Sequence, residues 1–263
     1  MLYLPYFMVF LLCIPLSSVA QTPCLSRLQH NSDEAIEEVQ AWLRATPTTD
    51  KSDVLSIPVV IHIVWHESVE NISDEQIYTQ MEVLNDAFRA QLAEANNVLD
   101  IFRDLVTDTK ITFCLVQRDP HAQATDGIVR IRVSDPAIVR DKAALFDASP
   151  LWNPRSYLNI YVVNLAESVD GEATFPSDAT ASDDAILINY RSFGTNGTAL
   201  LNPSRDGGKS LVHEVGHYLG LRHIWGSQEG CTFDDFEGED DTPLQSRSYL
   251  GRCPNGVQTS CGT

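Results

Sequence analysis

The residues with the clearest chemical potential are the histidines and the glutamate of the run HEVGHYLGLRH, which begins at His213. On a helix, residues four apart lie on one face about one turn apart, so His213 and His217 can direct two imidazole nitrogens at one ion. Glu214 lies in the same turn and can polarise a water bound to that ion. Gly220 can adopt a positive φ and end the helix, so that His223 returns as a third ligand. Three neutral nitrogens leave a position open for water, which is typical of a catalytic zinc site.

A bare H-E-x-x-H pattern can also occur by chance on an amphipathic helix, where its residues have a purely structural role. Here the longer pattern H-E-x-x-H-x-x-G-x-x-H also requires the glycine and the third histidine at their proper offsets. Three of the seven histidines of the chain fall within these eleven residues. The spacing therefore favours one zinc ion held by His213, His217 and His223, with Glu214 beside it.

Hydrophobic periodicity predicts the elements that must position this run. The helix with the histidines is predicted to begin near Lys209, after the turn-rich segment NPSRDGG. A second helix is predicted over 73–92, with Ser73 and Gln76 as a capping box. Apolar runs rich in β-branched residues predict strands at 57–66, 110–118, 127–133, 157–165, 171–175 and 185–193. Together these elements predict an α+β fold with a mixed sheet carried on two long helices.

The first twenty residues are apolar and uncharged and end in small residues. Ser18 and Ala20 occupy the −3 and −1 positions of a cleavage site, so residues 1–20 are predicted to be a signal peptide of a secreted protein. The alternative is a membrane anchor, because the run is nearly long enough to span a bilayer. No later segment resembles a transmembrane helix, so we expect no stable membrane association after removal of the signal. Residues 21–55 are polar and fit a pro-segment or an N-terminal extension of the folded domain.

The formal net charge of −18 argues against nucleic acid as a partner, because phosphate binding requires clustered Lys and Arg. Acidity favours solubility outside the cell, and clustered acids can also supply oxygen ligands for calcium. The densest cluster is the segment EGCTFDDFEGEDD, over 229–241, which holds seven acidic residues. The usual role of such a charge run is that of a solvated loop.

Six cysteines become five if Cys13 leaves with the signal peptide, and the remaining set is Cys24, Cys114, Cys231, Cys253 and Cys261. An odd number leaves at least one of them without an intramolecular partner. An oxidising compartment favours a disulfide among the last three. A thiolate from Cys24 could occupy the fourth zinc position and keep an enzyme latent, because zinc prefers thiolate to water. A disulfide or a bystander role for Cys24 is the alternative.

Several segments around the zinc run occur in the order seen in a known family. They are VVIHIVWH, LNDAFRA, YLNIYVVNL, GEATFP, AILINYRSFG, KSLVHEVGHYLGLRHIWG and DDTPLQ, and they run from about residue 56 to 245. On these segments the chain resembles the metzincin zinc metalloproteases, in particular the cytophagalysin-like branch of the pappalysin family, peptidase family M43.

The resemblance implies a metzincin-like zincin fold, with a twisted mixed five-stranded sheet, a backing helix and an active-site helix, and a catalytic domain over 56–263. It implies a secreted zinc endopeptidase that hydrolyses protein or peptide substrates with a zinc-activated water and Glu214 as general base. We expect the protein to be a monomer. The segment at 171–175 resembles the edge strand that binds an extended substrate by strand addition. An ordinary edge strand is the alternative.

The resemblance also implies features near the C-terminus. Calcium is a second candidate cofactor beside the DTP segment, with the candidate ligands Asp234, Asp235, Asp240, Asp241 and Thr242. Cys231 is expected to pair with Cys261, and the partner of Cys253 to lie beyond Thr263. The family has a methionine in a tight turn after the third histidine, whereas no methionine follows His223. We therefore expect a truncated C-terminal subdomain, with a natural short form as the alternative.

A second function stays open on the sequence alone. A chain that lacks part of its cleft could be a non-catalytic, zinc-stabilised binding module or an inactive truncated paralogue. The presence of Glu214 argues against this, because a protein that uses zinc only for structure has no need of that acid.

Overall fold

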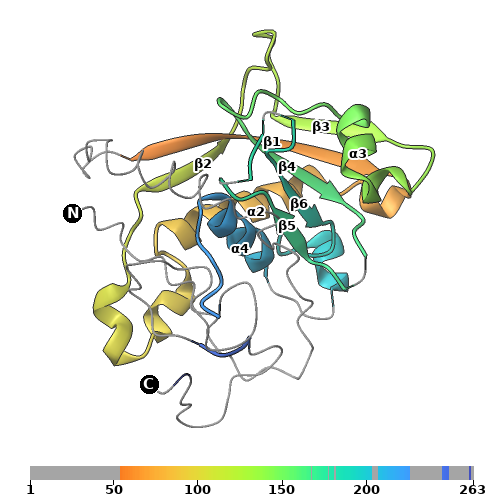
Figure 1. Cartoon of the computed structure of the whole chain (residues 1–263). Coiled ribbons are helices and arrows are strands. Elements are labelled where there is room, and N and C mark those ends of the chain that lie inside the picture. Colours follow the sequence, from red (N-terminus) through yellow and green to blue (C-terminus); the bar gives the residue numbers. More distant parts are fainter. Residues whose placement is uncertain are drawn as a thin grey trace.

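A mixed sheet with helices on both faces forms the part of the chain that the computed structural model describes (Figure 1). This part comprises residues 54–166, 168–176, 178–180, 182–202, 207–225, 245–248 and 261. The strands are β1 (Leu55–Trp65), β2 (Ile111–Leu115), β3 (Ile128–Arg132), β4 (Leu158–Val163), β5 (Gly171–Ala173) and β6 (Ile186–Asn189). The helices are α2 (Asp74–Phe88), α3 (Lys142–Ala148) and α4 (Lys209–Tyr218). Short 3₁₀ helices span Ser68–Glu70, Ala93–Asn97, Asp100–Leu105, Ile138–Arg140 and Gly197–Leu201.

The sheet has the strand order β2-β1-β4-β6-β5, and β3 also pairs with β1. β2 pairs with 55–59 of β1 and β3 pairs with 61–65, on the side away from β4, so these two short strands follow one another along a single edge. The sheet therefore contains six strands but is five strands wide. All pairings are parallel except that of β5 with β6. The predicted mixed five-stranded sheet of an α+β fold is confirmed.

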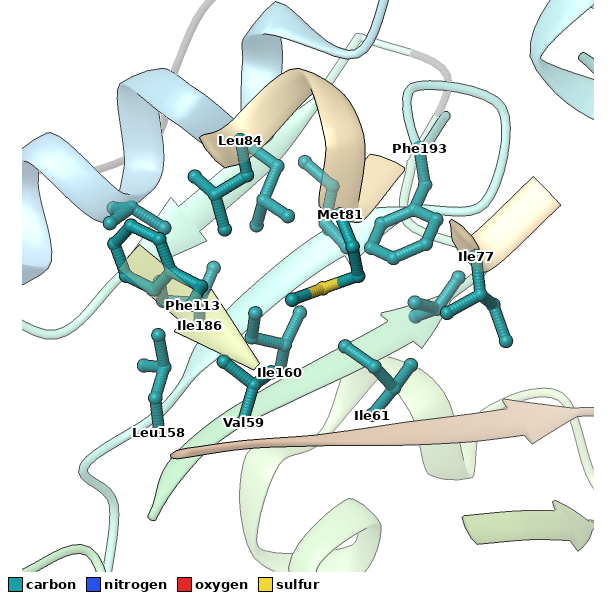
Figure 2. Packing of buried hydrophobic residues seen from close by; sticks show 14 of the residues in the cluster. Val59, Ile61, Ile77, Met81, Leu84, Phe113, Leu158, Ile160, Ile186 and Phe193 are labelled. Atoms are coloured by element: carbon teal, nitrogen blue, oxygen red, sulfur yellow. The ribbon is translucent and has the colours of Figure 1, made fainter. Parts of the chain in front are cut away.

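The central strands β1 and β4 are apolar along nearly their whole length because helices cover both faces of the sheet. One face packs on α2 and α4 and forms the larger core. Figure 2 shows Val59 and Ile61 of β1 and Ile160 of β4 on the same side as Met81 of α2. The opposite face packs on α3 through Leu145 and forms a smaller core.

The start of α2 follows the sequence prediction only in part. The hydroxyl of Ser73 accepts a hydrogen bond from the amide of Gln76, as an N-cap does. The Gln76 side chain does not return the bond as a capping box requires. Its amide instead donates to the carbonyls of Tyr190 (3.2 Å) and Phe193 (2.7 Å), which lie in the loop after β6. The predicted helix over 73–92 also ends earlier, at Phe88.

Helix α3 was not predicted from the sequence. Its N-cap is Asp141, whose carboxylate accepts a hydrogen bond from the amide of Ala144 at 2.9 Å. Because α3 is short, its apolar positions complete less than two turns of periodic pattern, so the cap was the only local signal. None of the helices in the described ranges is long and apolar enough to cross a membrane.

Candidate metal centre

Helix α4 begins and ends where the sequence predicted. Its N-cap is Gly208, with a φ of 80°, and Lys209 is its first residue. The helix ends at Tyr218, and two residues later Gly220 adopts a φ of 94°, a value that disfavours any residue with a Cβ. The Gly220 amide donates to the carbonyl of His217 at 2.8 Å, which closes the last turn and redirects the chain toward His223.

Three imidazole rings converge beside this turn. The Nε2 atom of His217 lies 2.9 Å from that of His213 and 3.1 Å from that of His223. The Nε2 atoms of His213 and His223 are 3.2 Å apart. Two nitrogens that bind one zinc ion tetrahedrally at about 2.0–2.1 Å are roughly 3.3 Å apart, so this donor set fits zinc. It is the only cluster of three or more metal-ligating side chains found among the described residues.

The protonation of the three rings suits metal binding. The Nδ1 atom of His217 lies 2.7 Å from the carbonyl oxygen of Leu221, which can only accept, so Nδ1 carries the proton and Nε2 presents its lone pair. Burial lowers the pKa of His217 below its usual value. Burial, followed by the charge of neighbouring histidines, also lowers the pKa of His213 and that of His223 to about 3. All three rings are therefore neutral near pH 7, as metal ligands must be.

Two aromatic side chains contact the candidate ligands, and the sequence did not indicate either contact. The ring of Phe175, just after β5, lies 5.0 Å from that of His217 between centroids. Trp225 stacks on His223, with centroids 4.5 Å apart and planes inclined by 12°. Trp225 follows the third histidine by two residues, so only its proximity in sequence could have suggested a contact.

Glu214 lies in the same turn of α4 as His213 and is 1% exposed. The helix places its side chain against the first residue of β5, at the edge of the sheet. A carboxylate beside a neutral metal-binding cluster can accept and return a proton during hydrolysis. The structure thus brings together the three histidines and the acid that the sequence had grouped.

The other predicted site residues are mostly not described. Asp234, Asp235, Asp240, Asp241 and Thr242 lie outside the described residues, as do Cys24, Cys231 and Cys253. Cys261 is in a disulfide bond, but its predicted pairing with Cys231 stays a prediction. Cys114 is a free, exposed thiol on β2, 3.3 Å from the hydroxyl of Ser56.

Comparison with known proteins places this geometry in a family. The peptidase M43 family, described as pregnancy-associated plasma protein-A, matches residues 142–263. An extracellular metalloprotease of Arthroderma otae is 27% identical over 247 residues, which are 92% of this chain and 78% of the relative. An extracellular metalloprotease of Arthroderma benhamiae is 28% identical over 232 residues, which are 87% of this chain and 72% of the relative.

Solved structures agree with these relatives. A promirolysin mutant of Tannerella forsythia is 32% identical with a TM-score of 0.76, and the match covers 90% of this chain and 80% of that one. Mature mirolysin in complex with a cleaved peptide is 34% identical with a TM-score of 0.68, covering 81% of this chain and 82% of that one. With this identity over most of both chains and a fitting zinc donor set, the chain belongs to the pappalysin family of metzincins, peptidase family M43, and is a zinc metalloendopeptidase that acts on proteins or peptides.

Proposed function

We propose that His213, His217 and His223 bind the catalytic zinc ion and that Glu214 is the general base in peptide-bond hydrolysis. The observation that carries this proposal is the convergence of three Nε2 atoms within 3.2 Å of one another, next to a buried carboxylate. Hydrogen bonds among these three nitrogens would require the rings to differ in tautomer, whereas one shared cation satisfies all three lone pairs.

In this proposal, Glu214 transfers the proton and the histidines hold the metal ion. When bound, zinc acts as a Lewis acid that lowers the pKa of a water molecule and polarises the scissile carbonyl. The carboxylate of Glu214 accepts the proton of the attacking water and passes it to the leaving amine. Burial of Glu214 strengthens this role, because few water molecules compete for its oxygens. The bond from His217 Nδ1 to the Leu221 carbonyl holds that ring in the tautomer the metal needs.

The substrate is proposed to bind as an additional strand along β5. Within the described residues β5 pairs with β6 alone, so its outer edge can offer backbone groups to an extended peptide. Phe175 lies two residues after β5 and contacts His217, so a strand on this edge would run past the proposed zinc ligands. The peptide in the complex of mature mirolysin supports a peptide-binding cleft in this fold.

The remaining parts of the proposal concern the rest of the chain. We infer secretion through a signal peptide at 1–20, a pro-segment or extension at 21–55 and a catalytic domain at 56–263. The extracellular names of the fungal relatives and the existence of a pro-form of mirolysin support this organisation. Latency through Cys24, calcium beside the DTP segment and the Cys231–Cys261 disulfide are further proposals that rest on the sequence.

The test compares Glu214→Ala with the wild type on a denatured protein substrate. We expect kcat to fall by about 10²- to 10⁴-fold while one zinc ion stays bound, because only proton transfer is lost. Glu82→Ala, which removes an exposed carboxylate from α2, is the matched control and should keep full activity. Equal cleavage by the wild type and Glu214→Ala would refute the proposed base. If neither protein cleaves with zinc bound, the non-catalytic binding module is the better explanation.

A further inference from the structure

The edge strand presents two small residues to the active-site helix. Side chains alternate along a strand, so Gly171 and Ala173 share one face and Glu172 has the other. Glu172 points away from α4 and forms an ion pair with Lys142 of α3, with an Nζ to Oε1 distance of 2.5 Å. Ala173 is buried in the larger core, on the side of α4. This small-residue face lets α4 approach β5 closely.

The closest approach is between Gly171 and Glu214. A Cβ atom added to Gly171 would lie 2.6 Å from Cγ of Glu214 and 3.0 Å from its Oε1. The same atom would lie 3.0 Å from Cδ1 of Ile188. Packed carbon atoms prefer a separation of about 3.5–4.0 Å, so the distance to Cγ is a collision. The Cγ atom is near the backbone of α4, and only a different χ1 rotamer can move it away.

The backbones of β5 and α4 are both held by other contacts. Gly171 is paired with Ile188 of β6, and the amide of Asn189 donates to the carbonyl of Asp170 at 2.7 Å. The carboxylate of Asp170 also accepts a hydrogen bond from the hydroxyl of Ser192. On the other side, α4 is anchored in the larger core by its fully buried residues, such as Leu211 and Val215. A side chain at position 171 would therefore displace the side chain of Glu214.

The need for glycine here is steric rather than conformational. Gly171 does not belong to the described glycines with a positive φ, so other residues could adopt its backbone conformation. Strand interiors disfavour glycine, because it loses conformational freedom and has no side chain to pack. Gly171 is present in this strand because a residue without a side chain leaves space for Glu214.

We propose that Gly171 is a positioning residue for Glu214, because the missing side chain creates the space in which the carboxylate is held beside the metal centre. This inference deepens the proposed role of Glu214 as general base and rests on it. Residue 171 then controls turnover without controlling zinc binding, since the three atoms nearest to an added Cβ belong to Glu214 and Ile188 and not to the histidines.

The first arm of the test is thermodynamic and does not depend on catalysis. Gly171→Ala is compared in the wild type and in Glu214→Ala, which has no Cγ or Oε1. We expect a clear drop in Tm in the wild-type background and a much smaller drop in the Glu214→Ala background, where only the flexible end of Ile188 remains close. Equal drops in both backgrounds would show that Gly171 serves the strand and would overturn the inference.

The second arm is kinetic. In Gly171→Ala we expect kcat to fall by about 10- to 100-fold, while the zinc dissociation constant stays within about twofold of the wild type. Glu82→Ala, at an exposed position of α2, serves as the control and keeps its kcat. Unchanged kcat in zinc-loaded Gly171→Ala would overturn the inference. Failure of the base itself would appear instead as full activity of Glu214→Ala.

Discussion

His223 reaches the metal centre from outside the helix, so its position depends on more than helical geometry. The turn at Gly220 redirects the chain, and Trp225 then covers the imidazole ring with its indole. His213 and His217, in contrast, are placed by α4 itself. At the residue scale, His223 is therefore the proposed zinc ligand that is most sensitive to a neighbouring side chain.

Replacing Trp225 tests this support. Trp225→Ala removes the surface on which His223 stacks, and we expect zinc affinity to fall by about 10- to 100-fold, as for other groups that orient a ligand. Trp225→Phe keeps a ring and should retain most of the affinity. Competition with a chelator measures both variants, and Trp152→Phe, on the far face of the sheet, is the control. Zinc affinity that does not change in Trp225→Ala would show that the turn alone orients His223.

At the scale of elements, α2 organises the start of the active-site helix with a buried amide. The Gln80 side chain is fully buried, and its Oε1 accepts a hydrogen bond from the amide of Gly194 at 2.6 Å. Its Nε2 donates to the carbonyl of Gly208, the N-cap of α4, at 3.0 Å. One side chain thus links α2, the loop after β6 and the N-cap of α4.

Gln80→Leu keeps the volume of the side chain but removes both hydrogen bonds. We expect the free energy of unfolding to fall by about 1–3 kcal/mol, because the buried Gly194 amide loses the acceptor that it uses. Urea unfolding of the zinc-loaded protein measures the change. Gln91→Leu, at an exposed position just after α2, is the control and should change stability by less than about 0.5 kcal/mol. A similar loss in the two variants would contradict the linking role.

At the scale of the whole molecule, the sheet face opposite the metal centre holds a second polar cluster. His62 of β1 is fully buried, with Nδ1 2.9 Å from the hydroxyl of Ser149 and Nε2 3.1 Å from Oδ1 of Asn159. Its ring stacks on Tyr161 at 4.3 Å. A serine, a histidine and an asparagine in contact could suggest nucleophilic catalysis, but no more than 1% of each is exposed, so the cluster is structural.

This buried histidine makes stability depend on pH. Burial lowers the pKa of His62 from 6.5 to about 4, against the opposing effect of the Asn159 hydrogen bond. The unfolded chain therefore binds a proton that the folded chain does not, and stability is lost as the pH falls from about 6.5 to about 4. The lowered pKa of His62 contributes roughly 3 kcal/mol to the free energy of unfolding at neutral pH.

Comparison of His62→Gln with the wild type isolates this effect. The variant has a lower free energy of unfolding than the wild type at neutral pH. We expect this difference between the two proteins to shrink by roughly 3 kcal/mol between about pH 7 and about pH 4. Zinc release at low pH affects both proteins and cancels in the difference. For His121→Gln, in an exposed loop, the difference in free energy of unfolding from the wild type should not shrink in this way. A difference that is constant with pH would mean that the pKa of His62 is the same in the folded and the unfolded protein.

Local pattern was enough to predict most elements and to group the candidate site residues that the structure brings together. The spacing of His213, Glu214, His217 and His223 indicated the zinc donor set, because helix periodicity and a glycine turn are properties of consecutive residues. The strands were predicted from short apolar runs, and the edge position of the strand at 171–175 from resemblance. The sequence by itself therefore determined the chemistry of the centre and the class of the fold.

Tertiary structure decided which side chains support that chemistry. The Gln76 side chain does not form the capping box, because it donates hydrogen bonds to the carbonyls of a loop more than a hundred residues away in sequence. Gly171 matters because folding brings it against Glu214, and no periodicity connects an edge strand to a distant helix. Such contacts arise when the sheet pairs and the core closes, so their physical cause is packing between elements, which a linear pattern does not contain.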